Sequence, residues 1–463
     1  MSTVSSSSGI IRKPFRTAVW VSRLFLVACL LAAMAFAWFV IVQLFAAREL
    51  AKYTDDLKSR GIPYDNATLQ TAYQAKTYTE GSETLQSILQ LSSWGLPLAS
   101  VNSLPLVGAS IERTNVDESI FGWKEWPTDA VPEKIVSDYL EEMEPMFRLL
   151  DELEKMPKPV RLELEMDGYG TRLDPLQESR RVLQVLSLEA RYAIFKKDKA
   201  RVLRAIKSME TICNAIDSQS FLVVDYMLVT FRSITQSVIQ ESMTVDLWDL
   251  SEIQQLKGIV ESDESRTIPW RRALEWERAM AVSSIESSST YRNSGVESIY
   301  WIPKFPSAKL KVMKHYDDYI EAAELPREQK LRTLASMEQN IYSLSNLIDG
   351  TAAILGLVMP SVLSIDGLEE RDQDSAKFAI IACGIRQFKL SEGRLPTGLV
   401  ELTTVGVPST AFSTADRGRF GYEIEDGKAW LWSYDLRDRR NKVTERRPTD
   451  PSQFQYQPTL AFE

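Results

Sequence analysis

Histidine is almost missing from this chain, since its 463 residues include only one, His315. Zinc sites of the His-Glu-x-x-His type, and any site with two histidine ligands, are therefore excluded. A nucleophile activated by histidine would have to use His315, which lies in a charged amphipathic stretch without a nucleophile motif; we predict a solvent-facing helical histidine there. The chain also lacks a Gly-x-Ser-x-Gly elbow and a Walker-type phosphate loop, so neither common enzyme signature is present.

Cysteine is scarce as well, with three residues in the whole chain. Cys29 lies in an apolar stretch near the N-terminus, which leaves Cys213 and Cys383. A single pair does not make a disulfide-stapled scaffold. We predict two buried thiols on apolar helix faces, and the sequence leaves their pairing open.

Basic residues are outnumbered by acidic ones. Four of the 54 basic residues precede residue 24 and none of the 63 acidic ones does, so residues 48–463 carry 50 basic and 63 acidic residues, a formal net charge of −13. Such a surface repels phosphate backbones, and we predict no nucleic-acid partner.

The most informative stretch that is present is the uncharged run 24–47. At about 1.5 Å per residue, a helix of this length crosses a hydrocarbon layer of roughly 30 Å. A signal-peptide core has about 7–15 residues, so the run predicts an uncleaved signal anchor, although small residues around Ala37 and Ala47 keep cleavage open. Basic residues resist translocation, and the segment before the run contains only basic charges: Arg12, Lys13, Arg16 and Arg23. We therefore predict a single-pass protein of the bacterial cytoplasmic membrane, with a cytoplasmic N-terminus and a periplasmic or otherwise extracytoplasmic bulk.

The predicted fold class is mainly α, with an N-terminal transmembrane helix, an exported domain of helical hairpins and a small C-terminal cap of helix and β-hairpin. We divide the chain into 1–23 (cytoplasmic tail), 24–47 (anchor), 48–132 (stalk helix and an aromatic, proline-rich connection), 133–365 (α-helical body), 366–440 (cap) and 441–463 (a polar, loosely attached tail).

Apolar residues at three- and four-residue steps predict the helices of the body. Residues 133–156 predict a helix that Pro145 kinks or splits, and Lys197 and Asp198 lie at the turn of a predicted hairpin. Asp225 is expected to face outward or to be paired locally. No period of about 34 residues recurs, so only repeat-like packing is indicated. The other predicted helices are 82–91, 176–196, 199–216, 221–243, 247–261, 268–284, 307–323, 326–348, 350–358 and 366–390.

Two segments have an alternating pattern typical of strands. Residues 160–166 predict a strand with Glu163, Glu165 and Asp167 on one face, which is more often a solvated edge than a metal site. Near the C-terminus, an Asp426-Gly427 turn between alternating β-formers predicts a hairpin over 420–434.

The stretch 379–402, Ala-Ile-Ile-Ala-Cys-Gly-Ile-Arg-Gln-Phe-Lys-Leu-Ser-Glu-Gly-Arg-Leu-Pro-Thr-Gly-Leu-Val-Glu-Leu, followed by this hairpin, resembles the globular end of type II secretion major pseudopilins. The resemblance implies a pilin-like cap. The run 24–47 lacks the cleavage glycine and early glutamate of that family. In place of the calcium loop of the pseudopilins, this chain has the basic segment 435–440. We therefore carry over no calcium site and predict no metal or cofactor.

The exported chain is also similar to a broad set of bacterial single-pass envelope proteins without an assigned activity. The similarity rests on Gly61-Ile62-Pro63, on the motif Ala273-Leu-Glu-Trp-Glu-Arg278 and on the pilin-like ending. It implies an architecture and no activity.

The sequence therefore favours a non-enzymatic, membrane-anchored helical scaffold that binds other envelope proteins, linked to secretion by the pseudopilin resemblance. No catalytic, cofactor-binding or metal-binding residue is assigned, and no small-molecule ligand is identified. One alternative is a carboxylate-dependent cell-envelope hydrolase, although residues two apart on a helix do not face each other and Glu277 and Arg278 also fit a polar network between helices. Its candidate residues are Glu275 and Glu277 with Arg278, or Glu163 with Glu165. Another alternative is an extracytoplasmic sensor or solute-binding module.

Overall fold

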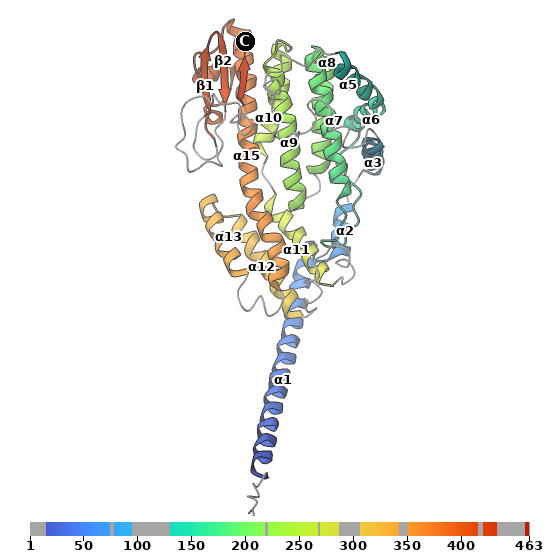
Figure 1. Cartoon of the computed structure of the whole chain (residues 1–463), viewed down its shortest axis with the longest axis vertical. Coiled ribbons are helices and arrows are strands. Elements are labelled where there is room, and N and C mark those ends of the chain that lie inside the picture. The colour runs from blue at the N-terminus through green and yellow to red at the C-terminus, as the bar shows by residue number, and fades with distance from the viewer. Residues whose placement is uncertain are drawn as a thin grey trace, which may run out of the picture.

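One long helix, α1 (Phe15–Ser59), projects from one end of a bundle of helices, and a small β-sheet lies with the C-terminus at the opposite end (Figure 1). The chain is mainly helical with an antiparallel sheet near its C-terminus, which confirms the predicted fold class at that level. The computed structural model describes residues 15–74, 78–94, 130–217, 221–266, 269–286, 306–341, 351–414, 420–432 and 459–462.

After α1, the described elements in chain order are α2 (Asn66–Gln74), α3 (Thr79–Trp94), α5 (Ala130–Glu142), α6 (Glu144–Lys155), α7 (Asp174–Phe195), α8 (Lys199–Asp217), α9 (Leu222–Met243), α10 (Leu250–Ser265), α11 (Trp270–Glu286), α12 (Pro306–Ala323), α13 (Arg327–Ile341), α15 (Thr351–Glu392), the short 3-10 helices η4 (Leu399–Val405) and η5 (Ser409–Phe412), and the strands β1 (Gly421–Glu425), β2 (Lys428–Trp432) and β3 (Thr459–Phe462).

Helix α1 runs without a break for 45 residues, and most of the apolar side chains in its first two-thirds are exposed. Two described helices, α1 and α9, are long and apolar enough to cross a membrane. Helix α9 is largely buried among α7, α8 and α15, so its apolar surface is core surface. Helix α1 stops before Gly61, whose positive φ of 67° lets the Ile62 amide donate to the Leu57 carbonyl at 2.9 Å.

The helices of the body largely follow their predicted bounds. Met143 alone separates α5 from α6, because Pro145 splits the amphipathic segment. The α7–α8 hairpin turns at Lys197, which adopts a positive φ of 56°. Helices α7, α8, α9, α10 and α15 enclose the main hydrophobic core. The apolar spacing therefore identified the segments that form α7 to α13.

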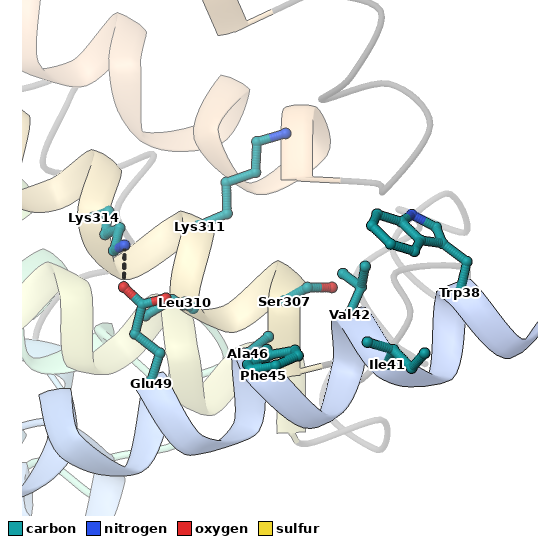
Figure 2. A pocket seen from close by; sticks show the side chains of 10 residues that line it. All are labelled: Trp38, Ile41, Val42, Phe45, Ala46, Glu49, Ser307, Leu310, Lys311 and Lys314. Atoms are coloured by element: carbon teal, nitrogen blue, oxygen red, sulfur yellow. Dashed lines mark hydrogen bonds and ion pairs between the residues drawn. The ribbon is translucent and has the colours of Figure 1, made fainter.

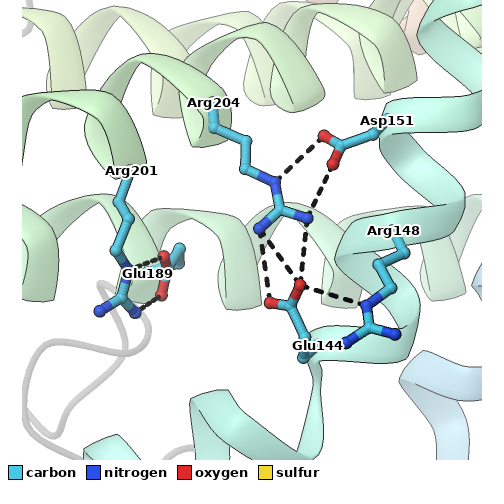
Figure 3. Close-up of polar contacts among 6 residues, drawn as sticks. All are labelled: Glu144, Arg148, Asp151, Glu189, Arg201 and Arg204. Atoms are coloured by element: carbon cyan, nitrogen blue, oxygen red, sulfur yellow. Dashed lines mark hydrogen bonds and ion pairs between the residues drawn. The ribbon is translucent and has the colours of Figure 1, made fainter.

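Ion pairs join the helices on one flank of this core, at the end away from α1. Figure 3 shows Arg204 of α8 donating to Asp151 and Glu144 of α6, with Nε to Asp151 Oδ1 at 3.1 Å. Arg201 of α8 forms a two-pronged pair with Glu189 of α7, at 2.7 and 2.6 Å. Both arginine side chains are about one-third exposed, at 31% and 38%.

The predicted helices 350–358 and 366–390 form one helix, α15, of 42 residues. The expected break is missing although Pro360 lies within the helix. A proline removes one backbone hydrogen bond, and α15 as a whole packs against α9, α10, α12 and α13.

Residues 160–166 are extended as predicted, but within the described chain they pair with no strand. Burial alternates correctly: Leu162, Leu164 and Met166 are buried, while Glu163 and Glu165 are exposed. Side chains of α2 take the role of a neighbouring strand. Tyr73 Oη donates to the Leu162 carbonyl at 2.6 Å, and Gln70 bonds the backbone of residues 164 and 166.

The predicted hairpin is confirmed as β1–β2, and both turn residues, Asp426 and Gly427, have the positive φ of a type I′ turn. The last residues correct the expectation of a loosely attached tail. Strand β3 pairs antiparallel with β2 and buries Leu460 and Phe462. The aromatic connection over 95–129, and the segments 287–305 and 433–458, lie outside the described residues.

Candidate functional site

The region where α1 enters the body is built from three helices, α1, α11 and α12. A small apolar cluster of Leu57, Val282 and Met313 takes one residue from each helix. Helices α1 and α12 also lie side by side over several turns. We call this region the junction.

Arg278 of α11 is the central polar residue of the junction. Its side chain is 2% exposed, and Nη1 donates to Asp317 Oδ1 of α12 at 2.6 Å and to Tyr53 Oη of α1 at 3.0 Å. Tyr53 Oη in turn donates to Asp317 Oδ2 at 2.5 Å, and burial raises the pKa of that phenol. Within the described residues, Nε and Nη2 of Arg278 are buried without a hydrogen-bond partner. The three side chains fix three helices to one another.

Gln43 makes the second polar connection. Its Nε2 donates to Ser307 Oγ at 2.9 Å, and its Oε1 accepts from the Ser307 amide at 3.2 Å. Gln43 is the one strongly polar residue of the run 24–47, and no role is predicted for it from the sequence. In the structure both ends of its amide hold the first turn of α12 against α1.

A groove of about 470 Å³ runs between α1 and α12 next to this connection (Figure 2). Apolar side chains of α1 line one end, and two lysines of α12 together with one carboxylate of α1 line the other. Lys314 Nζ bonds Glu49 Oε1 at 2.6 Å. The lining residues are Trp38, Ile41, Val42, Phe45, Ala46, Glu49, Ser307, Leu310, Lys311 and Lys314.

Glu277 precedes Arg278 and lies in a different, almost dry environment. It is 6% exposed, and burial raises the pKa of its carboxyl to about 7, with a smaller opposing effect from a backbone hydrogen bond at Leu222. Tyr316 of α12 is also fully buried nearby, and its hydroxyl lies 2.7 Å from that of Tyr169. The carboxyl is therefore about half protonated near neutral pH, because the charged form is poorly solvated.

Segments that precede α7 in the chain also hydrogen-bond to helix α11. Ser284 Oγ accepts the Tyr169 amide at 2.8 Å, and Ser283 Oγ accepts the Asn66 amide at 2.7 Å. Gly168 packs so tightly on α11 that an added Cβ would lie 2.3 Å from Ser284 Oγ. The motif 273–278 therefore belongs to a helix on which other elements converge, and all of its residues except Glu275 are buried.

The candidate carboxylates of the hydrolase alternative lie in contrasting environments. Glu163 and Glu165 are exposed on the extended segment, Glu275 is half-buried and Glu277 is buried. For Arg278, the alternative of a polar network between helices is confirmed by its bonds to Tyr53 and Asp317. The apolar surroundings of Glu277 account for its raised pKa without a catalytic role.

One prediction about a single polar residue is corrected. His315 is not solvent-facing: it packs edge-on against Tyr319 at 5.7 Å between ring centroids, and burial lowers its pKa. For Asp225, the outward-facing alternative is wrong, because the residue is 4% exposed in the first turns of α9, and the locally paired alternative stands. Cys213 and Cys383 are both buried and are not joined by a disulfide, as expected for thiols on apolar helix faces.

Sequence reasoning missed a buried polar cluster in the body. Arg232 of α9 lies 3.6 Å from Asp263 of α10 and 3.7 Å from Asp372 of α15, and Gln236 Nε2 donates to Asp372 Oδ1 at 3.2 Å. Burial raises the pKa of Asp372 to about 7, outweighing the nearby Arg232. Arg232 and Gln236, one helical turn apart on the apolar face of α9, were the available cue.

Among the residues that the structure describes, no group of three or more histidine, cysteine, aspartate or glutamate side chains is arranged to hold a metal ion. No protein-family model, curated protein or solved structure matches this chain.

Proposed function

We propose that the protein is a membrane-anchored helical scaffold of the bacterial envelope, whose extracytoplasmic body binds other envelope proteins without catalysing a reaction. The observation that carries the proposal is the continuity of α1, which passes from the apolar run into the body as one 45-residue helix. Arg278, Tyr53 and Asp317 then lock that helix to α11 and α12. Anchor and body form one rigid unit that holds a large helical surface at a fixed height over the bilayer.

The direction of the anchor follows from charge. Basic residues flank the run 24–47 on its N-terminal side, and such residues stay on the cytoplasmic side of a membrane. The body, with its acidic excess, is then extracytoplasmic. The ending of the chain supports a link to secretion, because α15, the Gly393 turn, η4 and the β1–β2 hairpin follow the order of elements in the pseudopilin-like stretch.

Topology is tested by adding protease outside spheroplasts that express the full-length protein with a C-terminal tag. We expect loss of the tag, together with retention of an N-terminal fragment in the membrane fraction. A cytoplasmic protein serves as the control for intact spheroplasts. A tag that survives while an exported control is digested, or a protein found in the soluble fraction, would overturn the proposal.

Partner binding is tested by crosslinking in intact cells and affinity purification from solubilised membranes. The control is an unrelated single-pass protein with the same tag and orientation, purified in parallel. We expect the same extracytoplasmic or membrane protein to be enriched over this control in independent cultures. Failure to recover any reproducible partner would contradict the binding function while leaving the topology untouched.

A further inference from the structure

Arg161 differs from the other arginines that are partly or fully buried in the described part of the chain. It lies on the extended segment 160–166, and burial of its guanidinium group is the main cause that lowers its pKa. Its charged neighbour is a second arginine, Arg272 of α11, which lowers that pKa further. Each of the other arginines instead lies beside a carboxylate: Arg181, Arg191, Arg201, Arg204, Arg232, Arg266, Arg278 and Arg386.

The guanidinium group of Arg161 has donors that the described residues do not use. Its Nη1 donates to the Tyr73 carbonyl in the last turn of α2, and its Cζ lies over the Tyr73 ring, 5.4 Å from the centroid. An arginine carries five N–H donors. Within the described residues, Nε is buried without a hydrogen-bond partner, whereas Nη2 makes no hydrogen bond and reaches the surface. Satisfying one carbonyl at the end of a helix therefore uses only part of this side chain.

The packing of α2 on α11 brings Arg272 to the same place. Tyr73 packs edge-on against Trp276 with 6.1 Å between ring centroids, and Trp276 lies one turn after Arg272 on α11. Arg272 is exposed and forms no hydrogen bond or ion pair with a described residue, although Arg271 beside it pairs with Glu324. Two positive side chains therefore lie close together at the surface, and neither has a carboxylate partner among the described residues.

Such a pair is unfavourable by itself, because like charges repel and a half-buried guanidinium group has lost part of its hydration. The body has an excess of acidic residues, yet the nearest one along α11, Glu275, forms no ion pair with Arg272 and does not act on Arg161. An oxyanion, meaning a group with negatively charged oxygen atoms, would remove the repulsion. The planar fork of a guanidinium group also matches the oxygen atoms of a carboxylate or a phosphate.

We propose that Arg161 and Arg272 form a binding site for one oxyanion at the place where α2 packs on α11. An oxygen atom of the ligand accepts a hydrogen bond from Arg161 Nη2, and the charge of Arg272 attracts the ligand. A free phosphate and an acidic side chain of a partner protein offer the same kind of oxygen atom. The site belongs to the body alone, so the inference rests neither on the membrane topology nor on the proposed partner binding.

The test measures anion binding to the full-length protein by isothermal titration calorimetry in a non-ionic detergent at constant ionic strength. Inorganic phosphate and glutarate, a dicarboxylate, are titrated separately. We expect at least one of them to bind with one site per protein. Phosphate binding alone identifies a phosphate ligand, and glutarate binding identifies a carboxylate ligand. If neither anion binds, the proposal is overturned.

Two variants locate the binding. Arg161→Met should abolish it, because the hydrogen-bonding group is lost; circular dichroism checks that this variant folds without its bond to the Tyr73 carbonyl. Arg272→Gln changes an exposed side chain and should weaken binding about threefold, the effect of one exposed ion pair. If either folded variant binds the anion as tightly as the parent protein, the ion lies elsewhere and the proposal is wrong.

The matched control is Arg332→Gln on α13, on the other side of the body from α2 (Figure 1). Arg332 is 82% exposed and forms an i,i+4 ion pair with Glu328. The substitution makes the same change in net charge as Arg272→Gln and should leave the anion affinity unchanged. An equal loss of affinity in Arg332→Gln and Arg272→Gln would overturn the proposal, because the binding would then reflect overall charge.

Discussion

Two regions of this molecule join helices with arginines, and they do so in opposite environments. On the flank of the body, Arg204 binds Asp151 and Glu144 of α6 while 31–39% of each of these three side chains remains in water. At the junction, Arg278 is 2% exposed and bonds Tyr53 and Asp317. Exposed pairs are screened by water and contribute little, whereas a buried charge depends on its partner.

The two regions also differ in how many buried apolar residues lie beneath their ion pairs. The flank lies on the main core, which is formed by helices on all sides. At the junction, a cluster of twelve buried residues packs α11 and α12 together, whereas the small cluster of Leu57, Val282 and Met313 joins α1 to these two helices. We therefore expect the flank to tolerate loss of its ion pairs, because apolar burial holds the helices there, and the attachment of α1 at the junction to depend on its polar contacts. Three measurements test this difference between the two regions.

The largest effect is expected from the buried acid of the junction, Glu277. Its folded pKa of about 7 lies above the usual value near 4.5, so the folded state holds a proton that the unfolded state releases. The stability from this group is complete below about pH 4.5 and is lost as the pH rises through 7, by about 3 kcal/mol. Glu277→Gln should match the parent protein near pH 5 and be more stable than it at pH 8. Urea unfolding in detergent, followed by circular dichroism at both pH values, measures this.

If Glu277→Gln and the parent protein differ in unfolding free energy by the same amount at pH 5 and at pH 8, then Glu277 is ionised in the folded protein. Glu275→Gln, a half-buried neighbour on the same helix, is the control and should show no such crossover.

The second measurement removes either member of the Arg278 pair. Asp317→Ala leaves the arginine buried with only Tyr53 as a partner, and we expect a loss of about 2 kcal/mol, reduced from the usual cost because Asp317 is 37% exposed. Arg278→Met instead leaves an aspartate that reaches water, so its cost should be smaller. Thermal unfolding of both variants in the same detergent gives the order, and a larger cost for Arg278→Met would contradict the account of the junction.

The smallest effect is expected on the flank. Arg204→Ala removes contacts to Asp151 and Glu144 that are each more than one-third exposed, and should cost about 0.5 kcal/mol. The loss should shrink further at high salt, because mobile ions screen such pairs. A cost as large as that of Asp317→Ala would erase the distinction between the two regions.

Local cues in the sequence were sufficient for much of the fold. The split at Pro145 and the turn at Asp426-Gly427 follow from the backbone limits of proline and glycine, and these limits hold wherever the segment packs. The helices of the α7–α8 hairpin follow from apolar spacing in the same way. Each of these features depends on residues within a few positions of one another.

Features that depend on residues far apart in the chain were not predicted from the sequence. The alternation of apolar and polar residues in 160–166 predicts which side chains are buried, but it does not predict which groups hydrogen-bond the backbone. In the structure, side chains of α2 form these bonds in place of a neighbouring strand. Strand β3 pairs with a strand about thirty positions earlier. Arg278 meets residues 225 and 39 positions away, so its partners were invisible even though its place in a polar network was foreseen. Gln43 was visible as the polar exception in an apolar run, but its use depended on α12.

The unbroken passage of α1 into the body has a mechanical consequence. A straight helix transmits rotation as well as height, so the rotation of its apolar part about the helix axis sets the direction in which every face of the body points. One residue inserted into α1 ahead of Gln43 would rotate the whole body by about 100° relative to the preceding turn and raise it by about 1.5 Å. A neighbour that packs against the apolar part of α1 would thereby determine which face of the body points toward that neighbour.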